Sequence, residues 1–236
     1  MSTINSVIDK IAILAEQSGY IGCLEYWSIC GGYNPDYNPD YPPRLSVEQT
    51  QELTQNYPFH LPLELCELYQ RGNSCLPIGV NPNKNWDSFD SYFQFEFPLE
   101  DDVFFPLGEA INTYRSIASW LKKDEDKLQI SRKTNNSQQK VLASLLNSNN
   151  FSSRLFPISS TENGLYVVVG NEKQQETSLI LFLSEDLVIS MKLSSLTCMM
   201  LGMAEVMERQ MQSPKPNGYE IEAIWHKYAA AESGNP

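Results

Sequence analysis

The side chains of this chain that are best suited to acid–base chemistry are two histidines and a group of carboxylates. His60 and His226 both lack a cysteine, histidine or carboxylate neighbour at metal-ligand spacing, so we interpret them as packing or surface residues. A pair of carboxylates is the arrangement that glycosidases use. A solvated acidic face fits this group better, because such enzymes line a long cleft with more aromatic residues. The carboxylates are Asp87, Asp90, Glu96, Glu100, Asp101 and Asp102.

Other catalytic signatures are missing from the sequence. The cysteine count is odd, and the spacing is not that of a metal site, which predicts reduced thiols in the cytoplasm. The sequence contains no glycine-rich phosphate loop, nucleophile elbow or dinucleotide fingerprint. We therefore predict no catalytic residue, no metal, no cofactor and no enzymatic activity. The cysteines are Cys23, Cys30, Cys66, Cys75 and Cys198.

The acidic charge is confined to one half of the chain. Residues 1–114 hold four basic residues against sixteen acidic ones, so this half alone accounts for the net charge of −12. The remaining residues hold thirteen of each sign. Such a charge repels nucleic acid and anionic membranes and favours a basic partner. The N-terminal stretch carries Asp9 at helical spacing, unlike a signal peptide, and no apolar run is long enough to span a membrane, so we expect a cytoplasmic protein.

A partner-binding surface is predicted where the acidic residues lie closest to exposed aromatic ones. Aromatic side chains often carry most of the energy of an interface, while carboxylates steer a basic partner toward it. The alternative is that these charges only keep the protein soluble. The candidate partner-binding residues are Trp86, Asp87, Asp90, Tyr92, Glu96, Glu100, Asp101 and Asp102.

The elements that must position this surface follow from hydrophobic periodicity. Residues 4–17 read as an amphipathic helix, and Ser46 with Gln49 forms a capping box that opens a second helix through about residue 57. Residues 92–97 alternate strictly, which predicts a strand with Phe93 and Phe95 buried and with Gln94 and Glu96 outward. Residues 165–169 and 179–183 predict a hairpin, and residues 187–193 predict a further strand.

Several helices complete this pattern. One begins near residue 107 and ends near residue 121, and residues 122–140 read as an exposed connection before a short helix at 141–146. Ser194 or Ser195 caps another helix, whose methionines either fill the core or line an adaptable groove. A last helix covers about residues 219–230. The methionines are Met199, Met200, Met203, Met207 and Met211.

A short helix within residues 61–79 organises the rest of the chain. Pro62 suits a first helical position, Leu65 and Leu68 fall at helical spacing as core residues, and Gly72 is placed to close the helix in a left-handed conformation. Glu64 lies in the first turn, where negative charge meets the positive end of the helix dipole.

This segment resembles the signature of the SUKH superfamily, which includes fungal cell-wall assembly regulators of the Smi/Knr type. Leu61, Pro62, Leu65 and Tyr69 match a leucine-proline, helix, asparagine-glycine element, although its closing pair is inverted to Gly72–Asn73. Later matches follow in the family's order: a helix start at Leu107, Glu109 and Ala110, a strand entry at Phe156, Pro157 and Ile158, and a serine-capped final helix.

The resemblance implies an α+β fold, with an antiparallel sheet flanked by helices, in a single domain of residues 1–236. Its common core covers about residues 46–211, and residues 1–45 and 213–236 are additions. It also implies a non-enzymatic protein-binding module, since many bacterial members resemble immunity proteins that neutralise toxins and fungal members act as signalling hubs. The partner is then a protein with a basic surface, such as a toxin domain. The alternatives are a structural or oligomerisation subunit and a carboxylate-dependent hydrolase.

Overall fold

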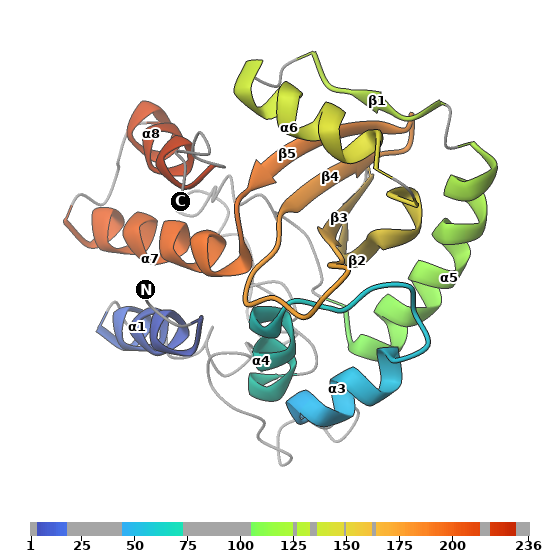
Figure 1. The fold of residues 1–236 in the computed structure, drawn as a ribbon. Coiled ribbons are helices and arrows are strands. Elements are labelled where there is room, and N and C mark those ends of the chain that lie inside the picture. Colours follow the sequence, from blue (N-terminus) through green and yellow to red (C-terminus); the bar gives the residue numbers. More distant parts are fainter. Residues whose placement is uncertain are drawn as a thin grey trace, which may run out of the picture.

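The computed structural model describes residues 4–17, 44–72, 105–124, 127–132, 136–148, 150–161, 164–212 and 218–229. Figure 1 shows a sheet with helices packed around it. The helices are α1 (Ile4–Gln17), α3 (Val47–Thr54), α4 (Leu63–Arg71), α5 (Leu107–Lys123), α6 (Asn136–Leu146), α7 (Leu196–Gln212) and α8 (Gly218–Tyr228), with a 3₁₀ turn η3 (Ser152–Arg154). The strands are β1 (Gln129–Ile130), β2 (Leu155–Thr161), β3 (Gly164–Val169), β4 (Ile180–Ser184) and β5 (Val188–Leu193).

The strands form one five-stranded sheet in the order β1-β5-β4-β3-β2. Strands β2 to β5 are an antiparallel meander, in which β3 and β4 form the predicted hairpin with Tyr166 opposite Phe182. Strand β1 instead runs parallel to β5. The predicted α+β fold is therefore confirmed, but the prediction of a purely antiparallel sheet is wrong at this edge. Parallel pairing needs a long crossover, and α6 with β2 to β4 supplies it.

The two faces of the sheet are both buried, and alternation along each strand assigns side chains to them. On one face, Tyr166 and Val168 of β3 join a core with α1, α4, α7 and the first half of α5. On the other face, Val167 and Val169 pack with Leu121 of α5 and Leu142 of α6. Figure 1 shows α6 on the side of the sheet away from α4. The sheet therefore forms the middle layer of the described structure.

Helices α3 and α4 confirm most of what their sequences predict. Ser46 Oγ accepts a hydrogen bond from the Gln49 backbone N–H at 3.2 Å, and the Gln49 side chain accepts one from the Ser46 N–H at 2.8 Å. Helix α3 ends at Thr54, a little earlier than expected. In α4, Leu65 and Leu68 are fully buried as predicted, and the Tyr69 hydroxyl donates to the Phe105 carbonyl.

The predicted ends of α4 are wrong in detail. Pro62 is the N-cap residue with ψ of 148°, one position before the first helical residue. Gly72 has φ of −164°, so it is extended rather than left-handed. Its N–H donates to the Leu68 carbonyl at 3.0 Å, which completes the last turn of the helix without a left-handed residue.

The predicted connection at 122–140 is also wrong, because it contains β1 and the first turns of α6. Strand β1 has only two residues, too few for an alternating pattern to show in the sequence. It exists through pairing with β5, where the Gln129 N–H donates to the Leu187 carbonyl and the Ser131 N–H to the Ile189 carbonyl. The edge strand therefore forms because of its pairing with β5 and not because of a local sequence pattern.

Helix α7 lies between α1 and α8 (Figure 1). Its Met199, Met200 and Met203 are buried in the core, so the core interpretation of the methionines is confirmed for these three. Met211, near the end of the helix, is exposed. Helix α1 buries its apolar side in the same core. Five side chains of α1 take part: Ile4, Val7, Ile8, Ile11 and Leu14.

Two further points concern the predicted strand at residues 92–97 and the length of the helices. The predicted strand at residues 92–97 lies outside the described residues. In the described ranges, none of the helices combines the length and the apolar character needed to cross a membrane.

Candidate functional site

The candidate partner-binding residues of the sequence analysis, from Trp86 to Asp102, all lie outside the described residues. The described part of the chain contains two other arrangements of charged side chains. One is a buried carboxylate at the junction of α4, the β3–β4 loop and α7. The other is a groove between α7 and α8.

Glu64, in the first turn of α4, carries the buried carboxylate. The residue is only 4% exposed. One carboxylate oxygen, Oε1, accepts hydrogen bonds from the Ser178 N–H at 3.2 Å and the Leu196 N–H at 3.0 Å. The other, Oε2, accepts from the Thr197 N–H and the Thr197 hydroxyl, both at 2.9 Å. One side chain therefore joins three segments that are far apart in the sequence.

The β3–β4 loop holds α4 in the position that this arrangement requires. The Leu63 and Glu64 N–H groups donate to the carbonyls of Gln175 and Glu176, at 2.9 and 3.0 Å. The Gln174 side chain donates to the Leu61 carbonyl at 2.7 Å. The first N–H groups of a helix have no partner within it, so the loop supplies acceptors that α4 lacks.

Helix α7 receives its own cap from two sources. Ser195 Oγ accepts from the Cys198 N–H at 2.9 Å, which confirms a serine cap at the predicted place. Glu64 satisfies the preceding Leu196 and Thr197 N–H groups. The Met199 N–H donates to the Ser195 carbonyl. The start of α7 thus depends on a carboxylate from α4 as well as on its local serine.

The electrostatics of Glu64 combine two opposing effects. Burial raises the pKa of its carboxyl group above the ordinary value, while hydrogen bonds from Thr197, Leu196 and Ser178 act in the lowering direction. Both oxygens already accept two hydrogen bonds each. The carboxylate is therefore occupied as an acceptor for backbone groups and is not poised to transfer a proton to a substrate.

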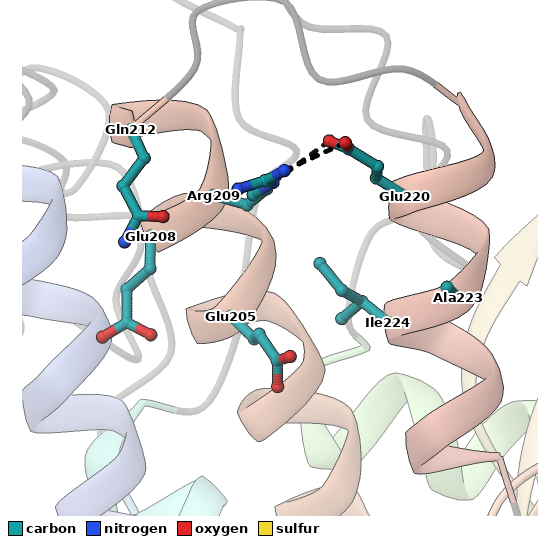
Figure 2. Close-up of a pocket in the computed structure, with 7 residues that line it drawn as sticks. All are labelled: Glu205, Glu208, Arg209, Gln212, Glu220, Ala223 and Ile224. Atoms are coloured by element: carbon teal, nitrogen blue, oxygen red, sulfur yellow. Dashed lines mark hydrogen bonds and ion pairs between the residues drawn. The ribbon is translucent and has the colours of Figure 1, made fainter.

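The groove between α7 and α8 encloses about 390 Å³. Figure 2 shows Arg209 of α7 reaching across to Glu220 of α8. Arg209 Nε donates to Glu220 Oε2 at 3.0 Å, and an Arg209 terminal nitrogen lies 2.9 Å from Oε1, so the pair is bidentate. The lining residues are Glu205, Glu208, Arg209, Gln212, Glu220, Ala223 and Ile224.

The carboxylates of the groove all have cationic partners. Glu208 points toward α1 in Figure 2 and pairs with Lys10 at 2.9 Å. Glu205 accepts from Lys227 at 2.6 Å and from the Tyr228 hydroxyl at 2.7 Å. Partial burial acts to raise the pKa of Glu205, but these hydrogen bonds outweigh it and the pKa is lowered. The pKa of Glu220 is lowered by its hydrogen bond with Arg209. The lowered pKa values keep Glu205 and Glu220 ionised at neutral pH. The three ion pairs clamp α1, α7 and α8 together.

The remaining reactive side chains of the described residues do not assemble into a catalytic group. Burial raises the pKa of the Cys66 thiol to about 12, so it stays protonated at neutral pH. Cys66 and Cys198 are free thiols. His60 is exposed, and its backbone pairs with Asn171. No cluster of three potential metal ligands occurs in the described ranges.

Sequence reasoning missed the role of Glu64. Its position in the first turn of a helix suggested a local interaction with the dipole of α4. Its partners at Ser178, Leu196 and Thr197 are more than a hundred residues away, so no local pattern identified them.

Comparisons with protein-family models, with curated proteins and with solved structures give no match to this chain.

Proposed function

We propose that this chain is a non-enzymatic protein-binding module that binds a basic protein through the acidic, aromatic-bearing segment of residues 86–102. The observation that carries the proposal is the location of the charge. Residues 1–114 contain the entire acidic excess, and four of the acids fall within residues 96–102. Oppositely charged surfaces speed the association of two proteins and disfavour wrong partners. An acidic segment that also carries aromatic residues is well suited to this role.

Support also comes from the ionisable groups of the described residues. Glu64, Tyr69 and Tyr114 are buried, and each is hydrogen-bonded to backbone groups of another segment. The carboxylates of the α7–α8 groove are ion-paired. These groups have structural roles, which favours binding over catalysis as the function of the described part.

The resemblance to the SUKH superfamily supports the same proposal. Three of the residues that carry it, Leu61, Leu65 and Tyr69, are buried in the hydrophobic core. A neutralising or scaffolding role in the cytoplasm, as in immunity and regulatory members of that superfamily, is the specific form of the proposal. A basic toxin domain is the partner that it implies.

The test uses the full chain as bait in cytosol from its own source. A captured partner is purified, and its association rate is measured at increasing salt. We expect the rate to fall steeply with salt, because exposed charges are screened beyond about 8–10 Å at physiological ionic strength. Reversing Glu100, Asp101 and Asp102 to lysine is expected to weaken binding while the melting temperature stays unchanged.

The matched control reverses three exposed acids outside the segment: Glu52, Glu172 and Glu185. It changes the net charge by the same amount, so it separates local recognition from the effect of total charge. Binding that ignores salt and responds equally to both triple reversals would contradict the proposal.

A further inference from the structure

The basic side chains of the described residues include two contrasting groups. Those on α1, α4, α7 and α8 are ion-paired: Lys10 with Glu208, Arg71 with Asp9, Arg209 with Glu220 and Lys227 with Glu205. A second group lies on α5, on α6 and on the segment between β1 and α6. Its five members are exposed, and none forms an ion pair with a described carboxylate. They are Arg115, Lys122, Lys123, Arg132 and Lys140.

These five side chains are concentrated in one part of the sequence, on α5, on α6 and on the segment between β1 and α6. Residues 115–140 contain seven basic residues against three acidic ones, in a chain whose net charge is −12. Figure 1 shows α5 and α7 on opposite sides of the molecule, with α5 leading into β1 and then into α6. We name the surface formed by the five cations the α5–α6 basic face.

An exposed tryptophan lies within this face. Trp120 of α5 is 38% exposed. Residues three and four apart are neighbours on a helix surface, so Trp120 lies beside Ser116 and Lys123, while Arg115 and Lys122 lie toward the other edge of the exposed side of α5. Tryptophan and arginine are the side chains most enriched among the residues that dominate interface energy. The face therefore combines an aromatic anchor with cations that form no ion pair with a described carboxylate.

We propose that the α5–α6 basic face is a second interaction surface, which binds an acidic peptide segment of a partner protein. Trp120 anchors an apolar side chain of that segment. The cations pair with its carboxylates. This surface is distinct from residues 86–102 and opposite to them in charge, so the chain would join a basic protein and an acidic one.

Charge favours a short acidic peptide over nucleic acid as the occupant. Duplex DNA carries one charge per about 1.7 Å, and its affinity for a protein depends on neutralising many phosphates. A chain with a net charge of −12 repels such a dense polyanion. Single-stranded nucleic acid binds through successive aromatic platforms. In the described part of this face, Trp120 is the aromatic side chain that is exposed.

The experiment measures binding of a fluorescein-labelled oligoglutamate peptide with one central phenylalanine to the full chain, by fluorescence anisotropy at physiological ionic strength, where the Debye length is about 8 Å. Replacing both Lys122 and Lys123 by glutamate is expected to weaken binding about tenfold. Trp120→Ala is expected to weaken it by a similar factor, because a tryptophan side chain buried in an interface contributes strongly to binding.

The matched control is the double reversal of Arg44 and Lys173 to glutamate. Both are exposed and form no ion pair with a described carboxylate, but they lie before α3 and in the β3–β4 loop. This control changes net charge equally and is expected to leave the affinity within about twofold, since charges beyond a Debye length are screened.

Circular dichroism establishes that each variant is folded. If the double variant Lys122→Glu/Lys123→Glu fails to fold, the double variant Lys122→Gln/Lys123→Gln replaces it and must still weaken binding. Three outcomes would each overturn the proposal. They are an equal loss of affinity in the two double reversals, an unchanged affinity of Trp120→Ala, and no binding of the peptide by the wild type. Tighter binding of a labelled oligothymidine than of the peptide would also overturn it, in favour of nucleic acid.

Discussion

Replacing Glu64 by glutamine tests whether a carboxylate from α4 holds the start of α7. Glutamine has the same shape, but its amide nitrogen cannot accept a hydrogen bond. Glu64 Oε1 faces two N–H donors, and Oε2 faces one N–H and one hydroxyl. The least costly orientation places the amide nitrogen at the Oε2 position, because the Thr197 hydroxyl can rotate and accept from it.

In that orientation the Thr197 backbone N–H is left without an acceptor in a buried site. A buried donor that loses its partner costs about 1–3 kcal/mol. Removing the buried charge recovers part of this cost, since desolvation opposes the ionised form. We therefore expect Glu64→Gln to lower the free energy of unfolding by about 1–3 kcal/mol at neutral pH, a large share of a typical domain's stability.

The assay is urea unfolding followed by circular dichroism, with Glu52→Gln as the control. Glu52 is exposed on α3, and a change there is expected to stay within about 0.5 kcal/mol, as for most surface positions. Equal unfolding midpoints for the two variants would refute the reasoning, because they would mean that the four hydrogen bonds do not contribute net stability.

Three further predictions concern stability. The raised pKa of Glu64 means that the folded state binds its proton more tightly than the unfolded state, so this group's contribution to stability should increase as pH falls from 7 through its folded pKa toward the ordinary value of 4.5. Urea unfolding at several pH values should then show the stability difference between wild type and Glu64→Gln widening as pH falls. Leu68→Ala should cost about 2–5 kcal/mol, measured by thermal unfolding, because Leu68 is fully buried; an unchanged melting temperature would mean that α4 is peripheral. Gly202→Ala would place a methyl group 2.5 Å from the Trp225 ring, so it should displace α8 and change Trp225 fluorescence, whereas unchanged fluorescence would contradict the packing of α7 on α8.

The local elements of the fold were determined by short-range patterns. Ser46 and Gln49 identify the start of α3 because a capping box involves groups only three residues apart. The apolar spacing of α1 and α4 identified the buried side chains, since a helix brings every third or fourth residue to one face. The hairpin of β3 and β4 could also be predicted from the local sequence, because two apolar runs flank one polar loop.

The tertiary structure alone decided the features that depend on distant partners. Strand β1 has two residues and forms because β5 offers it backbone groups, so its parallel direction had no local signature. In the sequence, Glu64 cannot be distinguished from any other acidic residue in the first turn of a helix. Its burial, its raised pKa and its role at the start of α7 follow from N–H groups more than a hundred residues away. In the same way, the sequence shows how many cations lie in residues 115–140, but only the fold shows that Lys127 pairs with Asp124 and that the cations of α1, α4, α7 and α8 are ion-paired. The fold also shows that five cations form no ion pair with a described carboxylate: Arg115, Lys122, Lys123, Arg132 and Lys140.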